Sequence, residues 1–353
     1  MDMHSLLKEM MTRGASDLHL VAGISPVLRI DGYMKRLGDK PLTPEEVKSL
    51  IYPVMSAKKI AEFEKTRELD FSLEMNGTGR FRTNLHFQKG SIAAAIRHIP
   101  DNVPTLSELN LPPILAELAL KRSGLILVTG PAGCGKSTTQ AAMVKIINED
   151  RSAHIITLED PMEYLHSHNK SVVEQREVGS DTFSFAESLK RCLRQDPDVI
   201  LIGEMRDLET IATAITAAET GHLVLATLHT PDAPGAVDRI IDVFPSHQQS
   251  QTRTQLANTL QAIIAQFLLP QKSDAGRVPA VELLIANSAV RNLIRSGKSH
   301  ELYTAMETGT QSGMRTMDQA LKDLVNRNMV SYETAVARVR NRAIFEKSLM
   351  YQS

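Results

Sequence analysis

Residues 130–137 have the types and spacing of a phosphate-binding loop, GxxxxGK[ST]. Gly130, Gly133 and Gly135 let main-chain amides converge on phosphate oxygens without an obstructing Cβ atom. Lys136 supplies a positive charge to the β- and γ-phosphates, and the Ser137 hydroxyl can coordinate Mg²⁺. The sequence therefore predicts a site for ATP. The residues expected to contact the nucleotide here are Gly130, Pro131, Ala132, Gly133, Cys134, Gly135, Lys136, Ser137 and Thr138.

Glu204 lies just beyond a second apolar run, residues 199–202. An acid delivered to the carboxyl end of an apolar strand is typical of the second nucleotide-binding motif. Gly203 occupies the position where an aspartate is usual, so we expect Glu204 to position and deprotonate the attacking water rather than to hold the metal. The alternative is a surface acid at the end of a strand.

Three more acids, Glu159, Asp160 and Glu163, follow the apolar run 154–158. Parallel strands open their carboxyl ends on one edge of a sheet, so these acids should share a crevice with the phosphate loop. We expect Glu159 or Glu163 to act on Mg²⁺ through water and Asp160 to shape the turn. A purely structural role is equally open for each of them.

Histidines and arginines complete the set of candidates. His229 ends the apolar run 223–228 and could sense the γ-phosphate, whereas His222 begins that run and needs a different or indirect role at the nucleotide site. An isolated histidine is also often structural. Phosphoryl transfer calls for a cation, often from a neighbouring subunit. The candidate arginines are Arg80, Arg82, Arg97 and Arg206.

From Gly124 onward, short apolar strands alternate with helical patterns, which predicts a parallel sheet covered on both faces. A helical apolar face is also expected over 256–268, ending at Pro270. The fold class is therefore α/β: a RecA-like P-loop core preceded by a smaller, strand-rich α+β unit and followed by a helical tail. The expected parts are 1–100 for the N-terminal domain, 101–115 for the linker, 116–285 for the core and 286–353 for the tail.

Composition narrows the function further. The chain has 353 residues, with 40 basic and 41 acidic side chains and a formal net charge of −1. This balance attracts no polyanion, so nucleic acid is a poor default partner. No apolar run approaches the ~18–20 residues that span a bilayer, and the first residues lack a signal-peptide core, so we expect a cytosolic protein. Two isolated cysteines support neither a zinc site nor a disulfide framework.

Together these motifs resemble the type II/IV secretion ATPase superfamily (the GspE/PilT family), and most closely its pilus-retraction branch. Two loop positions, Ala132 and Cys134, differ from the usual Thr and Ser, and 231–235 departs from the family's usual sequence. The segments that carry the resemblance are 15–20, 29–32, 130–138, 157–161, 202–207, 220–223, 227–230, 290–295 and 317–321.

The resemblance implies a homohexameric motor that hydrolyses ATP with Mg²⁺ to retract type IV pili, which drives twitching motility. Each subunit would combine a PAS-like N-terminal domain with the RecA-like domain, and Arg82 and Arg97 would help complete the nucleotide site. The partners implied are the inner-membrane platform protein (PilC-like), pilin indirectly and a paralogous retraction ATPase. The location implied is the cytoplasmic face of the bacterial inner membrane, and Arg291 and Arg295 are expected to couple hydrolysis to retraction.

Several alternatives remain open from the sequence. An accessory retraction ATPase (PilU-like) would share these motifs. Pilus assembly and type II secretion ATPases resemble the chain but carry an extra N-terminal domain and a tetracysteine zinc site. A non-hydrolysing regulatory ring subunit is disfavoured by Lys136, Ser137 and Glu204, and a nucleic-acid translocase by the charge balance.

Overall fold

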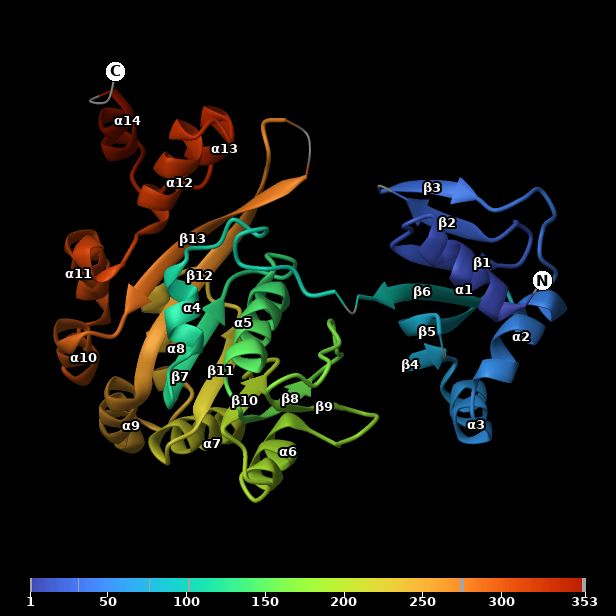
Figure 1. The fold of residues 1–353 in the computed structure, drawn as a ribbon, viewed down its shortest axis with the longest axis horizontal. Coiled ribbons are helices and arrows are strands. Elements are labelled where there is room, and N and C mark those ends of the chain that lie inside the picture. Colours follow the sequence, from blue (N-terminus) through green and yellow to red (C-terminus); the bar gives the residue numbers. More distant parts are fainter. Residues whose placement is uncertain (1, 31, 76, 101, 274–275, 351–353) are drawn as a thin grey trace. The chain divides into compact units, whose positions relative to one another are not determined.

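The protein folds as two compact units, Met1–Asn102 and Val103–Ser353. Each unit has its own hydrophobic core. Figure 1 labels the helices and strands of each unit. The computed structural model describes residues 2–30, 32–75, 77–100, 102–273 and 276–350.

The first unit is built on a six-stranded antiparallel sheet of order β3-β2-β1-β6-β5-β4. Its helix α2 starts at a capping box, in which the Thr43 hydroxyl accepts from Glu46 N at 3.1 Å. Within the sheet, Arg82 of β5 lies opposite Arg97 of β6. The elements are α1 (Met3–Thr12), β1 (Asp17–Val21), β2 (Val27–Ile30), β3 (Tyr33–Arg36), α2 (Pro44–Ile51), α3 (Ala57–Thr66), β4 (Glu68–Met75), β5 (Gly79–Gln88) and β6 (Ser91–Ile99).

The second unit is built on a seven-stranded sheet of order β13-β12-β7-β11-β10-β8-β9. All neighbouring strands are parallel except β12 and β13. The four strands predicted from the sequence are confirmed as β7, β8, β10 and β11, whereas β9, β12 and β13 were not predicted. The strands are β7 (Gly124–Thr129), β8 (His154–Glu159), β9 (Val172–Glu177), β10 (Val199–Ile202), β11 (Leu223–Leu228), β12 (Leu260–Pro270) and β13 (Arg277–Ile285).

Helices cover both faces of this sheet, as its fully apolar strands require. In β7, Ile126 and Val128 face the core cluster beneath α4 and α5, while Leu125 and Leu127 face the cluster beneath α7, α8 and α9. The helices are α4 (Ile114–Ala119), α5 (Lys136–Asp150), α6 (Phe185–Cys192), α7 (Leu208–Glu219), α8 (Ala233–Asp242), α9 (Ser246–Thr259), α10 (Ser288–Arg295) and α11 (Leu302–Thr308).

The long helix expected over 256–268 is wrong. Helix α9 ends at Thr259, and Leu260–Pro270 forms β12, which pairs in parallel with β7 and antiparallel with β13. A nearly continuous apolar run satisfies helical and strand periods alike. The hydrogen-bonding edge of β7, which local periodicity does not reveal, decided between the two.

The helical C-terminal region packs on the β12–β13 hairpin. Helices α12 (Met317–Asn326), α13 (Tyr332–Val336) and α14 (Arg342–Met350) lie within the tail that the sequence predicts to be helical. They share a core cluster with Leu269 and Val278, one from each strand of the hairpin. None of the helices within the described ranges has the length and apolar character needed to cross a bilayer.

The proline-rich segment that follows the first unit packs on the second. Leu106 and Leu111 are buried in the same core cluster as Leu115 of α4. Position 101, where the expected linker begins, and positions 351–353, where the expected tail ends, lie outside the described residues.

Candidate active site

The phosphate loop connects the carboxyl end of β7 to the first turn of α5. Gly130 has φ +140°, and a Cβ there would lie 2.4 Å from the main-chain oxygen of Gln266. Gly135 caps α5 with φ +89°. Both positions therefore require glycine, for close approach and for a left-handed backbone. The unpaired amides at the start of α5 favour an anion at this point.

Lys136 is held at the rim of the loop. It is 9% exposed, and its Nζ donates to Gly130 O at 2.8 Å and Pro131 O at 3.1 Å. Burial lowers the pKa of Lys136, an effect that the nearby Cys134 thiol and the carboxylates of Glu204 and Glu163 oppose. The ammonium group is thus oriented by loop carbonyls and lies within the field of the predicted acids.

Gln266 of β12 braces the loop from below, a role that the sequence did not suggest. This side chain is 1% exposed. Its Nε2 donates to Cys134 O at 2.7 Å, and its Oε1 accepts from Thr139 Oγ1 at 2.9 Å. In the sequence, Gln266 stands out only as a polar residue among apolar neighbours. The pairing of β12 with β7 brings it to its partners in the loop and in α5.

Glu204 and His229 come together from the ends of neighbouring strands. Glu204 Oε1 lies 3.2 Å from His229 Nε2 and 2.6 Å from Arg206 Nε. Burial by itself raises the pKa of Glu204, but the hydrogen bond from Arg206 and the charges of His229 and Arg206 outweigh it, so the pKa lies below its ordinary value. The carboxylate is therefore ionised at neutral pH, which suits a group that orients water more than one that holds its proton.

The acids after β8 take different positions. Glu159 is half-buried, and its Oε1 accepts from Thr157 Oγ1 at 2.6 Å and Gln175 Nε2 at 3.1 Å. Burial raises the pKa of Glu159, against the lowering effect of these hydrogen bonds. Glu163 is exposed, and next to it the Tyr164 hydroxyl lies 3.1 Å from Thr138 Oγ1. Glu159 thus joins β8 to β9, whereas Glu163 remains open to a ligand.

Short ties fix the strand ends around the site. The Thr129 hydroxyl, at the last position of β7, donates to Thr230 O and lies 2.7 Å from Thr230 Oγ1. The Thr227 hydroxyl donates to Gly203 O. These contacts fasten the segments on both sides of His229 to the strands that carry the loop and Glu204.

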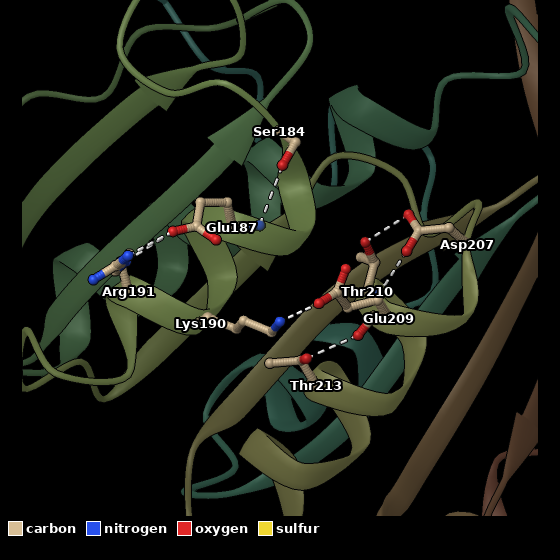
Figure 2. Close-up of polar contacts among 8 residues, drawn as sticks. All are labelled: Ser184, Glu187, Lys190, Arg191, Asp207, Glu209, Thr210 and Thr213. Atoms are coloured by element: carbon tan, nitrogen blue, oxygen red, sulfur yellow. Dashed lines mark hydrogen bonds and ion pairs between the residues drawn. The ribbon is translucent and has the colours of Figure 1, made fainter.

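The turn after Glu204 is fixed by the N-cap of α7 (Figure 2). The Asp207 carboxylate caps α7 by accepting from Thr210 N at 2.8 Å and Thr210 Oγ1 at 2.7 Å. Lys190 of α6 pairs with Glu209 in the first turn of α7 (Figure 2). Because this cap holds the start of α7, it also sets the position of the adjacent Arg206.

These side chains surround one pocket of about 350 Å³. It brings together the loop, the acids after β8, Glu204 and His229. Its other lining residues are Gln140, Ala141, Pro161, Tyr164, His166, Phe185, Leu201, Gly203, Arg206, Asp207 and Thr227.

Several predicted site residues do not line this pocket, namely His222, Arg82, Arg97 and, from the loop itself, Gly130, Pro131, Cys134, Gly135 and Thr138. His222 sits at the amino end of β11, where its Nδ1 bonds to Ala217 O at 2.9 Å and so caps α7. The length of β11 separates His222 from His229, so any part His222 plays at this pocket is indirect, as expected from the sequence. Arg82 and Arg97 belong to the first unit, where Arg97 Nε donates to the buried Asp17 carboxylate at 2.8 Å.

A parallel sheet with a P-loop at its carboxyl edge and a strand-end glutamate facing the same pocket defines a P-loop ATPase. The chain belongs to the family described as Type II/IV secretion system protein, which it matches over residues 1–343. The fold is the two-domain fold of these secretion ATPases.

Three known proteins match the chain over most of its length and of their own. The type IV pilus retraction ATPase PilT of Pseudomonas aeruginosa is 47% identical, with 95% of this chain and 97% of that protein covered. The type IV pilus ATPase PilU of the same organism is 42% identical, with 96% of this chain and 88% of that protein covered. A crystal structure of the pilus retraction motor PilT with bound ADP has 49% identity and a TM-score of 0.92, covering 98% of this chain and 99% of that one.

Proposed function

We propose that this protein is the ATP-hydrolysing motor of type IV pilus retraction. The observation that carries the proposal is the convergence of the P-loop, Glu204 and His229 on one pocket, in a chain similar over 95% of its length to a retraction ATPase. The chain is 47% identical to that relative over 95% of its length, against 36% identity over 68% of its length to a type II secretion protein E from Aeromonas hydrophila. This contrast favours retraction over secretion or assembly.

In the proposed reaction the loop amides and Lys136 hold the triphosphate, and Glu204 orients a water for attack on the γ-phosphorus. His229, hydrogen-bonded to Glu204, is close enough to the same edge to respond to the γ-phosphate. The oxygen donors of Ser137 and Glu163 fit Mg²⁺, with Glu159 acting through water. When bound, Mg²⁺ would neutralise charge on the β- and γ-phosphates.

The reaction also needs a cation for the transition state. We assign this role to N-terminal arginines, Arg82 or Arg97, which are one strand apart in register. In a homohexameric ring, closure of the two units around nucleotide would bring them to the site and convert hydrolysis into movement. The motor would act at the cytoplasmic face of the inner membrane, on a platform protein and through it on pilin.

Glu204→Gln tests the enzymatic part. Loss of the carboxylate should lower steady-state phosphate release by about 10²–10⁴-fold while ATP binding survives, because the loop is unchanged. Glu209→Gln is the matched control: its carboxylate belongs to a surface pair with Lys190, and exposed pairs contribute little. Equal activity in Glu204→Gln and the parent would remove Glu204 from the mechanism.

Gene deletion scored for surface pili and twitching tests the cellular part. Excess pili without movement is the expected result, because retraction would stop while assembly continued. Bald cells would instead indicate an assembly motor. Normal twitching that becomes defective only under load would favour the accessory role suggested by the PilU similarity.

A further inference from the structure

Glu282 is a buried acid that the mechanism above does not use. It lies on β13 and is 1% exposed. Its Oε1 accepts from Ala233 N at 2.8 Å, and its Oε2 accepts from Met317 N at 3.2 Å. Ala233 and Met317 are the first residues of α8 and α12. One carboxylate therefore binds the amino ends of two helices that are far apart in the sequence.

Both helices already have ordinary caps, so Glu282 is not a substitute for one. The Asp232 carboxylate accepts from Gly235 N at 2.7 Å. Thr316 forms a capping box with Gln319. Glu282 instead satisfies the first amide of each helix, which has no partner within the helix. An apolar side chain would avoid the cost of burying an acid but could not join these two amides.

The sheet connects Glu282 to the catalytic edge. Leu228, Thr129, Ala265 and Glu282 occupy one row across β11, β7, β12 and β13. Leu228 directly precedes His229, and Thr129 directly precedes the phosphate loop. Glu282 is thus level with the site, two strands away from the loop strand.

The segment after His229 is fastened at both ends. Thr129 holds Thr230, and Glu282 holds Ala233, with only Pro231 and Asp232 between them. So short a connection transmits a shift at His229 to the first turn of α8, and therefore to the carboxylate that α8 shares with α12.

The other side of the contact is equally constrained. Arg315 exchanges main-chain hydrogen bonds with Leu283, at 2.7 and 2.9 Å, immediately before α12. Leu321 and Leu324 of α12 pack in the core cluster that contains α14 residue Phe345. A movement of the Glu282 side chain would consequently shift the start of α12, the first of the C-terminal helices.

We propose that Glu282 is a positioning residue that links the His229 segment to the C-terminal helices, through hydrogen bonds from one buried carboxylate to the first amides of α8 and α12. The proposal rests on the proposed ATPase function. It identifies how the state of the nucleotide pocket reaches α12, which contributes no residue to that pocket.

Hydrogen exchange on the full chain, with and without ADP and Mg²⁺, tests this link in Glu282→Gln. In the parent, ADP should slow exchange in the loop and change it in the first turns of α8 and α12. The variant should keep the loop protection but lose the change at α12, because an amide offers one acceptor where two are needed. Its kcat should fall about 2- to 30-fold with KM for ATP unchanged.

Asp318→Asn is the matched control. The Asp318 carboxylate also accepts from two main-chain amides, Arg340 N at 2.8 Å and Asn341 N at 3.2 Å, but both partners lie in the C-terminal region. This variant should keep the ADP response at α12. Glu282→Leu, which buries no charge, replaces the glutamine variant if that one does not fold, with the same expectations.

An ADP response at α12 that persists in the Glu282 variant, or an unchanged kcat, would overturn the link. So would a parent whose loop is protected by ADP while α12 does not respond. Failure of ADP to protect the loop of the parent is a different result: it would refute the nucleotide site itself, and the link with it.

Discussion

Replacing Gln266 with leucine removes the side-chain amide that supports the phosphate loop and puts an apolar side chain of similar size in its place. Two buried hydrogen bonds disappear, to Cys134 O and from Thr139 Oγ1. Each is worth about 0.5–1.5 kcal/mol net, so the folded state should lose roughly 1–3 kcal/mol. Because Cys134 lies inside the loop, part of this lost stability should come from a loop that is no longer held in one conformation.

Part of the free energy of ATP binding is then used to restore the loop geometry, which lowers the affinity for ATP. If about 1–2 kcal/mol of the loss is recovered in this way, the Kd for ATP weakens by roughly 5- to 30-fold, since 1.4 kcal/mol corresponds to a factor of ten. Equilibrium titration with a fluorescent ATP analogue measures the Kd, and a thermal melt measures the stability.

Gln261→Leu provides the control on the same strand. Gln261 Nε2 donates to Ser123 O at 3.2 Å, at the end of β12 remote from the loop. This variant should lower stability modestly and leave the Kd unchanged. If Gln266→Leu lowers the melting temperature but leaves the Kd within about twofold of the parent, β12 supports the fold and not the loop, and the reasoning fails.

Three further predictions follow from single contacts. Gly130→Ala should weaken ATP binding by more than about tenfold in the same titration, because its Cβ would meet Gln266 O at 2.4 Å; binding equal to the parent would contradict the loop geometry. Burial raises the pKa of Glu282 to about 7, with Asp232 adding to the rise and Arg340 opposing it. The unfolded chain binds fewer protons at this site, so stability should fall by about 3 kcal/mol between pH ~4.5 and ~7. Denaturant titrations at several pH values should show this slope in the parent and not in Glu282→Leu. Arg291 donates to Ala257 O and Asn258 O at the end of α9. Arg291→Ala should keep ATP hydrolysis but abolish twitching in cells. Normal twitching in this variant would refute the coupling role of Arg291.

The sequence alone was sufficient for the parts of the molecule that local patterns encode. The P-loop depends on fixed spacing of glycines and one lysine, and the strands leading to it and to Glu204 are short and wholly apolar. The rule that parallel strands open on one edge then indicated that the loop, Glu204 and His229 share a pocket. The Thr-Pro-Glu-Glu sequence at 43–46 predicts the start of α2, and Gly221 predicts the end of α7, each to within a residue or two.

Only the tertiary structure determines the contacts between segments that are far apart in the sequence and whose local patterns are ambiguous. The run 260–270 fits a helix as well as a strand until β7 offers it a partner. Gln266 and Glu282 are polar residues flanked by apolar ones in their strands, and no local pattern shows whether such a residue supports the loop or lies at the surface. Their roles depend on which backbone amides and carbonyls lie within hydrogen-bonding distance, about 3 Å. Strand order and register across the sheet determine these partners.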